Sequence, residues 1–148
     1  MIGMEILQPV AVLAAWTMVM WLWMYVTRIP AMGKAGIDSR NLVGGTGKSL
    51  DDTLPPNVQW IAHNYNHLHE APTVFYAVAL ASAIVGGEIG GGFNAQIAWA
   101  YVGLRIVHSL VQAISNRVIV RFALFALSSV ALIMLTVHLL IAVFQLHV

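Results

Sequence analysis

The chain has 148 residues, of which 59% are hydrophobic and 9% are charged, whereas about a quarter of the residues in an ordinary soluble domain are charged. So few charged groups cannot cover a soluble globule of this length, and the composition therefore indicates a protein surrounded by lipid. The net charge of +1 and the lack of cysteine exclude a basic nucleic-acid-binding domain, a disulfide scaffold and a cysteine nucleophile.

Four stretches are apolar enough to cross a membrane, which takes about 20 residues in an α-helix. The predicted spans are residues 7–26, 60–85, 96–114 and 118–145. The first has no basic segment ahead of it and is too long for the core of a typical signal peptide, so we expect it to be retained. The sequence predicts an all-α, polytopic membrane protein in which residues 1–148 form a single membrane domain.

The connections between the spans predict the orientation of the chain. The long polar loop, residues 27–57, contains several Lys and Arg residues and the third connection contains Arg117, whereas the glycine-rich connection 86–92 has neither residue type. By the positive-inside rule, the two basic connections face the cytoplasm and both termini lie outside it. A compact chain without a retention signal favours a bacterial inner membrane.

Polar side chains recur at the spacing of one helix face in the second and third spans and at the start of the fourth. These residues are His63, Asn66, His67 and Glu70, then Arg105, His108, Ser109 and Gln112, and finally Arg117 and Arg121. In the predicted orientation, all three stripes lie in the cytoplasmic leaflet. An ionisable group at the centre of a span costs about 2.5–3.5 kcal/mol and usually marks function. The stripes therefore predict a shared polar site.

The charges of these stripes predict the kind of ligand. Glu70 and Arg105 fall at similar depth, so we expect them to pair within one chain or between neighbouring chains. Three Arg residues against one Glu predict a cationic pocket that suits an anionic ligand. The alternative is that the charges only hold the helices in register. His138 and His147 lie outside the stripes and are assigned no role.

Two further motifs are typical of other functions, phosphate binding and metal binding. The segment 44–49, GGTGKS, is similar to a phosphate-binding loop, but Leu42 stands where that motif requires Gly, so a flexible turn is the better interpretation. His63, His67 and Glu70 could present a metal ion from one helix face, and a His/Glu metal site therefore stays an alternative.

The segment 64–76, NYNHLHEAPTVFY, combines Asn, Glu, Pro and aromatic residues on the second span, and Arg105, His108 and Arg121 follow on the third and fourth. These blocks resemble the membrane-associated proteins in eicosanoid and glutathione metabolism, the MAPEG family, and in particular its prostaglandin E synthase branch. The four spans and the long first loop are similar as well. The chain is expected to be a bacterial-type member.

The resemblance implies a homotrimer of four-helix subunits that binds glutathione between subunits and takes lipophilic small molecules from the membrane lipid. The implied activity is that of a glutathione-dependent transferase, peroxidase or isomerase acting on lipophilic electrophiles. Arg121 would be the catalytic residue, because a guanidinium group lowers the pKa of a nearby thiol and stabilises the thiolate. The residues expected to bind glutathione are His67, Glu70, Arg105, His108 and Gln112, with Arg117 completing the cationic pocket.

The chain departs from the family pattern on the second span. His63 and Asn66 stand where the family commonly has Arg residues that bind carboxylates. A non-enzymatic membrane protein of the same fold that binds lipid or small molecules is therefore the alternative function.

Overall fold

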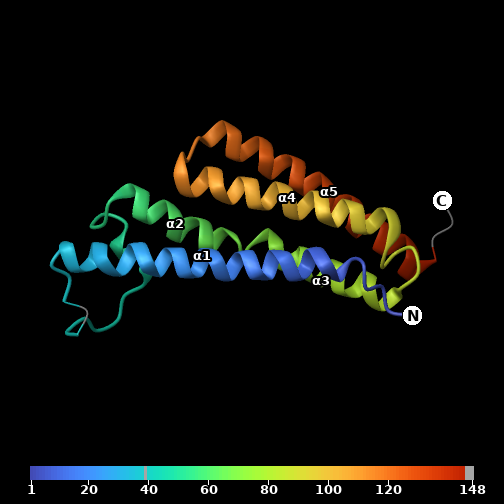
Figure 1. Cartoon of the computed structure of the whole chain (residues 1–148), viewed down its shortest axis with the longest axis horizontal. Coiled ribbons are helices and arrows are strands. Elements are labelled where there is room, and N and C mark those ends of the chain that lie inside the picture. Colours follow the sequence, from blue (N-terminus) through green and yellow to red (C-terminus); the bar gives the residue numbers. More distant parts are fainter. Residues whose placement is uncertain (39, 146–148) are drawn as a thin grey trace.

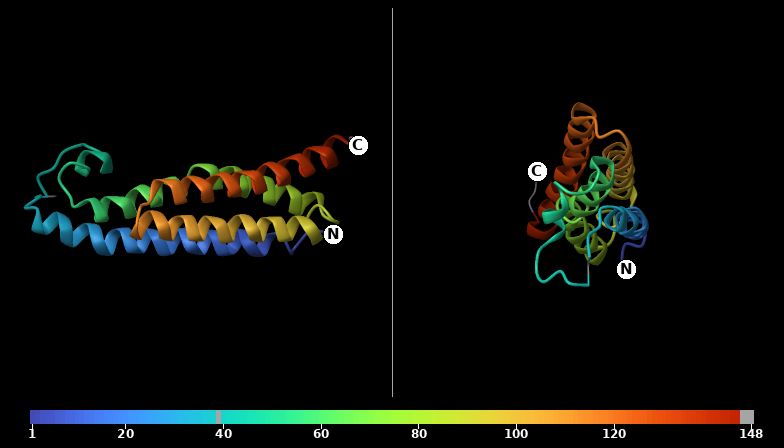
Figure 2. Two further views of the ribbon diagram at one scale, coloured as in Figure 1. Left: turned by 90° about the horizontal axis from the view of Figure 1, so that it is seen from above. Right: turned by 90° about the vertical axis from the view of Figure 1, so that its left-hand side faces the viewer.

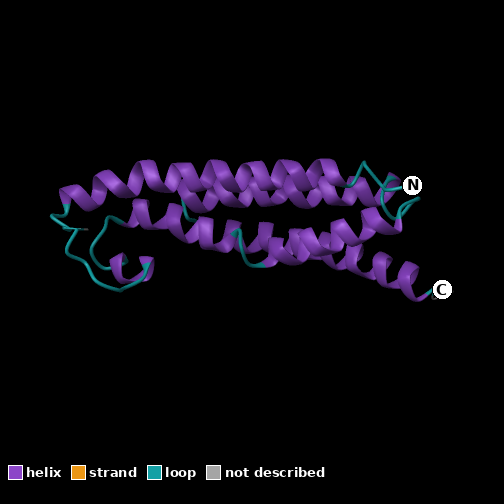
Figure 3. Ribbon diagram, turned by 90° about the horizontal axis from the view of Figure 1, so that it is seen from below, coloured by secondary structure: helices purple, strands orange, loops and turns teal. Residues whose placement is uncertain are grey.

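The computed structural model describes residues 1–38 and 40–145, so the predicted tail residue His147 lies outside the described residues. The described residues form helices, turns and loops without a strand (Figures 1 and 3). The helices are α1 (Leu7–Lys34), the short 3-10 helix η1 (Gly47–Leu50), α2 (Pro56–His67), α3 (Ala71–Val85), α4 (Gly92–Ile114) and α5 (Val118–Phe144). Within the described residues, and with α2 and α3 together making one span, 4 spans are long and apolar enough to cross a membrane, which confirms the predicted fold class.

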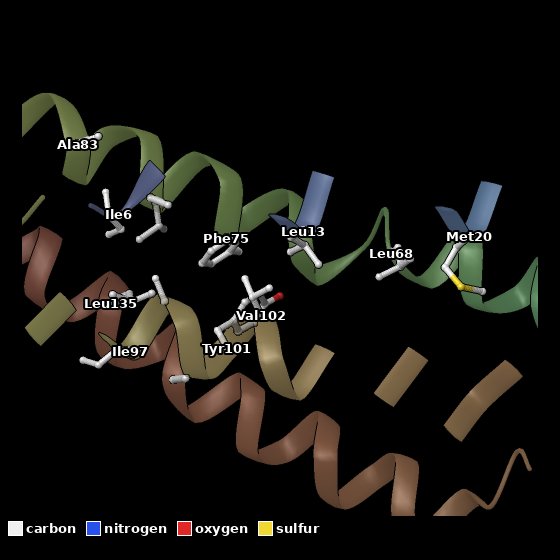
Figure 4. Packing of buried hydrophobic residues seen from close by; sticks show 14 of the residues in the cluster. Ile6, Leu13, Met20, Leu68, Phe75, Ala83, Ile97, Tyr101, Val102 and Leu135 are labelled. Carbon is white, nitrogen blue, oxygen red and sulfur yellow. The ribbon is translucent and has the colours of Figure 1, made fainter. Parts of the chain in front are cut away.

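The helices run roughly along one long axis (Figures 1 and 2). The long loop and the α4–α5 turn lie toward one end of the bundle, and the N-terminus and the end of α5 lie toward the other. α4 packs on α5, α1 and α2, and α5 also packs on α3. Buried side chains from several helices meet in the core, among them Leu13, Phe75, Tyr101 and Leu135 (Figure 4).

The first helix extends beyond its predicted end at residue 26 and continues to Lys34 despite Pro30. Hydropathy marks the part of a helix that lies in hydrocarbon, whereas the backbone helix can continue into the polar zone beyond it. Thr27 supports this continuation, because its hydroxyl donates to the carbonyl oxygen of Trp23 at 2.9 Å. For the same reason α2 begins at Pro56 and α4 at Gly92, each ahead of the predicted span.

The second span is interrupted, whereas the sequence predicts one continuous span over residues 60–85. α2 ends at His67 and α3 begins at Ala71. Pro72 lies in the first turn of α3, where its missing N–H costs least, and it cannot donate to the carbonyl group of Leu68. Glu70 has φ −94° and ψ −105°, outside the helical region. The break therefore falls at residues 68–70, next to the predicted polar site.

The N-terminal segment closes the end of the bundle that holds the α3–α4 turn. The N–H of Gly3 donates to the carbonyl oxygen of Ala83 at 2.8 Å. Glu5 accepts a 2.8 Å hydrogen bond from the N–H of Gly92, the first residue of α4, so a carboxylate lies at the positive end of that helix. Gly3 and Gly90 pass so closely that a Cβ added to Gly90 would lie 2.7 Å from the Cα of Gly3.

We expect Gly90→Ala to destabilise the protein by about 1–3 kcal/mol, because the added methyl group meets backbone atoms that cannot rotate away. Gly33→Ala is the matched control, since nothing lies within 4 Å of the added Cβ and alanine favours a helix. Thermal unfolding of the full chain in detergent, followed by circular dichroism, measures both. Equal midpoints for the two variants would show that the close approach does not matter for stability.

Candidate functional site

A hollow of about 230 Å³ lies where the end of α2 meets α4 and the start of α5. Its walls combine two imidazoles, one guanidinium and three apolar side chains. The lining residues are His67 from α2, His108 from α4, and Val118, Arg121, Phe122 and Phe125 from α5. Three of the predicted site residues, His67, His108 and Arg121, are thus brought together by one chain.

The two histidines of the hollow stack on each other. The ring centroids of His67 and His108 are 5.0 Å apart and the ring planes differ by 21°, while the edge of Phe125 meets His67 at 5.8 Å. The facing helices are fixed nearby by a buried hydrogen bond from the side-chain amide of Asn64 to the hydroxyl of Ser109. This contact sets how α2 faces α4, and it therefore orients the histidine pair.

Arg121 is positioned by the turn that joins α4 to α5. Asn116 adopts a left-handed conformation, φ 50°, which asparagine tolerates better than most residues. Its side-chain oxygen accepts a hydrogen bond from Nη1 of Arg121. The half-buried guanidinium is therefore directed by a neutral partner and keeps its charge available to the hollow.

Arg105 is buried against the inner side of this site, with 1% of its surface exposed. Its Nε donates to the hydroxyl of Tyr101 at 3.2 Å, and its Cζ lies 5.6 Å from the Tyr101 ring centroid and 5.4 Å from that of Phe125. Among the described residues, Nη1 and Nη2 have no hydrogen-bond partner. A buried cation with unsatisfied donors is costly, and it favours the approach of an anion.

The expected pair of Glu70 and Arg105 does not form within one chain. The Glu70 side chain is 66% exposed, and its Oε2 lies 3.7 Å from Nε2 of His67. The interruption of the second span is the reason, because a helical stripe no longer continues from His63 to Glu70 once α2 ends at His67. Glu70 therefore lies beside the hollow, and Arg105 lacks a carboxylate partner among the described residues.

Two other predicted site residues lie away from the hollow. Gln112 is buried on α4, one turn beyond His108, and its Oε1 has no partner among the described residues. Arg117 is exposed and forms the N-cap of α5. Neither lines the hollow of its own chain, so a role in ligand binding stays a prediction that would need a second protomer.

The sequence of nearly the whole chain is similar to that of a known protein family. A family model described as the MAPEG family matches residues 6–141, which include nearly all of the four spans. The chain belongs to the MAPEG family. No curated protein and no solved structure matches the chain significantly.

MAPEG membership confirms the resemblance found in the two sequence blocks and supports an integral membrane protein with a glutathione-related function of the transferase or isomerase type. Members of the MAPEG family generally use glutathione. The hollow offers what a peptide thiol needs, a cation for a thiolate or carboxylate and hydrogen-bonding imidazoles.

Two aromatic residues of the candidate site, Tyr101 and Phe125, are not singled out by the sequence pattern. Tyr101 and Phe125, which flank Arg105, lie one helical turn from Arg105 and Arg121 respectively, so the i, i+4 spacing was the available signal. Apolar and aromatic residues are abundant in membrane spans, and this spacing alone therefore does not single them out.

A second hollow, of about 160 Å³, lies on the α1 side of α2. It is lined by Arg28, Gly47, Lys48, Asp51, Ala62, His63 and Asn66. His63 faces Asp51 of the loop at 3.1 Å, whereas His67 faces His108. His63 and His67 therefore belong to different hollows. The described residues contain no group of three His, Cys, Asp or Glu side chains that could hold a metal ion. This separation weighs against the alternative of a metal site.

Proposed function

We propose that this MAPEG protein is a glutathione-dependent transferase, peroxidase or isomerase that acts on lipophilic electrophiles. The observation that carries the proposal is the presence of two guanidinium groups around Phe125: Arg121 lines the hollow together with Phe125, and the buried Arg105 lies 5.4 Å from the centroid of the same ring. The carboxylate of Glu70 is exposed beside His67. Positive charge therefore exceeds negative charge at the site, which favours an anionic ligand.

In this proposal Arg121 stabilises the thiolate of glutathione. A free thiol is mostly protonated near neutral pH, and only its thiolate is a good nucleophile. A guanidinium beside the sulfur favours the charged form, so the thiol proton leaves to solvent. In a transferase reaction the sulfur then forms a bond to an electrophilic carbon, and the leaving group on that carbon, such as a halide, departs with its bonding electron pair. The apolar side chains of Val118, Phe122 and Phe125 give a lipophilic electrophile a surface next to that sulfur.

The remaining groups would hold the rest of the peptide. The unsatisfied donors of Arg105 suit a carboxylate of glutathione, and the exposed carboxylate of Glu70 suits its ammonium group. His67 and His108 supply hydrogen bonds to the peptide backbone.

The proposal includes a homotrimer whose subunits share the site. Pockets for small molecules usually measure about 300–1,000 Å³, so the hollow of about 230 Å³ is small for a tripeptide and gains from a facing protomer. Across such an interface Gln112 and Arg117 would approach the ligand. We further propose a bacterial inner membrane with both termini outside the cytoplasm, since the two basic connections lie toward one end of the bundle.

Titration of glutathione into the detergent-purified protein tests this function. We expect a saturable rise in the ultraviolet absorbance of the thiolate, because the site converts bound thiol into thiolate. S-methylglutathione is the matched control, since it offers the same carboxylates but cannot ionise at sulfur. A lack of signal together with retained lipid would contradict the enzyme and favour the non-enzymatic binding protein.

A further inference from the structure

A separate polar hollow of about 370 Å³ lies at the opposite end of the bundle, between the start of α4 and the later turns of α5. It is lined by Glu88, Ile89, Gly92, Phe93, Asn94 and His138. His138 is half-buried in the largely apolar second half of α5, and the proposed glutathione chemistry does not use it. A polar side chain is costly in such a place, so its partners indicate what it does.

The hydrogen bonds of Asn94 fix which ring nitrogen of His138 carries the proton. The side-chain nitrogen of buried Asn94 donates to the carbonyl oxygen of Ile89 at 3.3 Å, so its side-chain oxygen is the atom that meets Nδ1 of His138 at 2.6 Å. Because that oxygen can only accept, Nδ1 must donate. In the neutral imidazole, Nε2 is then left as an acceptor.

The other groups of the hollow favour a cation. Glu88 contributes a carboxylate, and Phe93 contributes an aromatic ring whose centroid lies 6.4 Å from that of His138. The positive end of α4 is offset by Glu5, which accepts the N–H of Gly92. Residues 1–27, 86–104 and 122–145 contain no Lys or Arg, so no basic side chain from these segments competes for the hollow.

We propose that this hollow binds the primary ammonium group of an ethanolamine lipid headgroup. The carboxylate of Glu88 and Nε2 of His138 accept its N–H groups, and the ring of Phe93 attracts the charge through its face. A primary ammonium has three donors for these acceptors, whereas the trimethylammonium of a choline lipid has none and is bulkier.

The depth of the hollow favours a lipid over a soluble amine. α5 has 27 residues and is therefore about 40 Å long, whereas the hydrocarbon core measures about 30 Å. His138 precedes the end of α5 at Phe144 by six residues, or about 9 Å, which is close to the headgroup boundary. Phe93 is exposed on the outer surface of the helices, where lipid would reach it.

Lipid retention by the purified full-length protein tests this site. The protein is equilibrated in detergent with equal amounts of dioleoyl phosphatidylethanolamine and dioleoyl phosphatidylcholine, and the lipids that stay bound are measured by mass spectrometry. We expect a preference for the ethanolamine lipid on the order of tenfold, because hydrogen bonds between charged partners are among the stronger ones. Glu88→Gln and His138→Phe should each remove most of this preference.

Asp52→Asn is the matched control, since it removes one carboxylate from the exposed long loop and should leave the preference intact. Glu88 is exposed on a turn, so its variant tests the site even where His138→Phe fails to fold. Equal retention of both lipids, or a preference that survives both variants, would overturn the proposal. Displacement of the lipid by soluble ethanolamine at matched concentration would show that the occupant is a free amine and would overturn the lipid assignment.

Discussion

Replacing Arg121 by leucine is expected to lower glutathione-dependent turnover by about 10²-fold or more, because electrostatic stabilisation of developing charge is usually the largest catalytic contribution. The half-buried Arg121 supplies the guanidinium among the residues that line the hollow and has a neutral partner in Asn116, so its replacement by leucine removes that charge from the lining. Conjugation of glutathione to a halonitrobenzene, followed by absorbance, measures the loss.

Two further variants sharpen this test. Arg121→Lys keeps the charge but not the planar fork of donors, so we expect partial activity. Arg40→Leu removes a positive charge from the exposed loop and should leave turnover unchanged. Full activity in Arg121→Leu would show that another group stabilises the thiolate.

Arg105→Met is expected to separate ligand binding from folding. Hydrogen bonds to charged groups contribute about 1.5–3 kcal/mol, and each 1.4 kcal/mol corresponds to a factor of about ten, so glutathione affinity should fall by about tenfold to a hundredfold. The thermal midpoint should stay the same or rise, because methionine avoids burying the unsatisfied donors of Arg105. Calorimetric titration and thermal unfolding measure the two effects.

The alternative that Arg105 only holds the helices in register predicts the opposite pattern, a loss of stability in Arg105→Met with no separate loss of affinity. Tyr101→Phe is the control for the packing around the guanidinium. It keeps the ring that stacks on Phe75 at 4.5 Å and removes only the hydroxyl that accepts from Nε of Arg105. We expect a smaller change in affinity than in Arg105→Met.

Hydropathy predicted four apolar stretches, and four helical spans have the length and composition to cross a membrane among the described residues, but hydropathy did not predict the ends of the helices. The mean hydropathy falls where polar residues begin, so the predicted first span stops at residue 26. The α-helical backbone of α1 nevertheless continues to Lys34. Pro72 signalled an irregularity in the second span, but its position alone did not distinguish a kink from two separate helices. A break in a membrane helix leaves backbone N–H and C=O groups without their helical partners. Whether neighbouring helices can satisfy these groups depends on how the bundle packs.

The sequence by itself determined that lipid surrounds the protein, that it crosses the membrane on four apolar stretches, and that His67, His108 and Arg121 fall near one another. The first two conclusions depend on composition and hydropathy, and the third on the 3.6-residue period combined with the predicted orientation of the spans, which places the three residues in one leaflet but does not fix their contacts. Only the tertiary structure decided which side chains contact one another. Glu70 lies beside His67 rather than Arg105, and His63 faces the loop, because partners across helices depend on where a helix breaks, how far it rotates and how deep it lies.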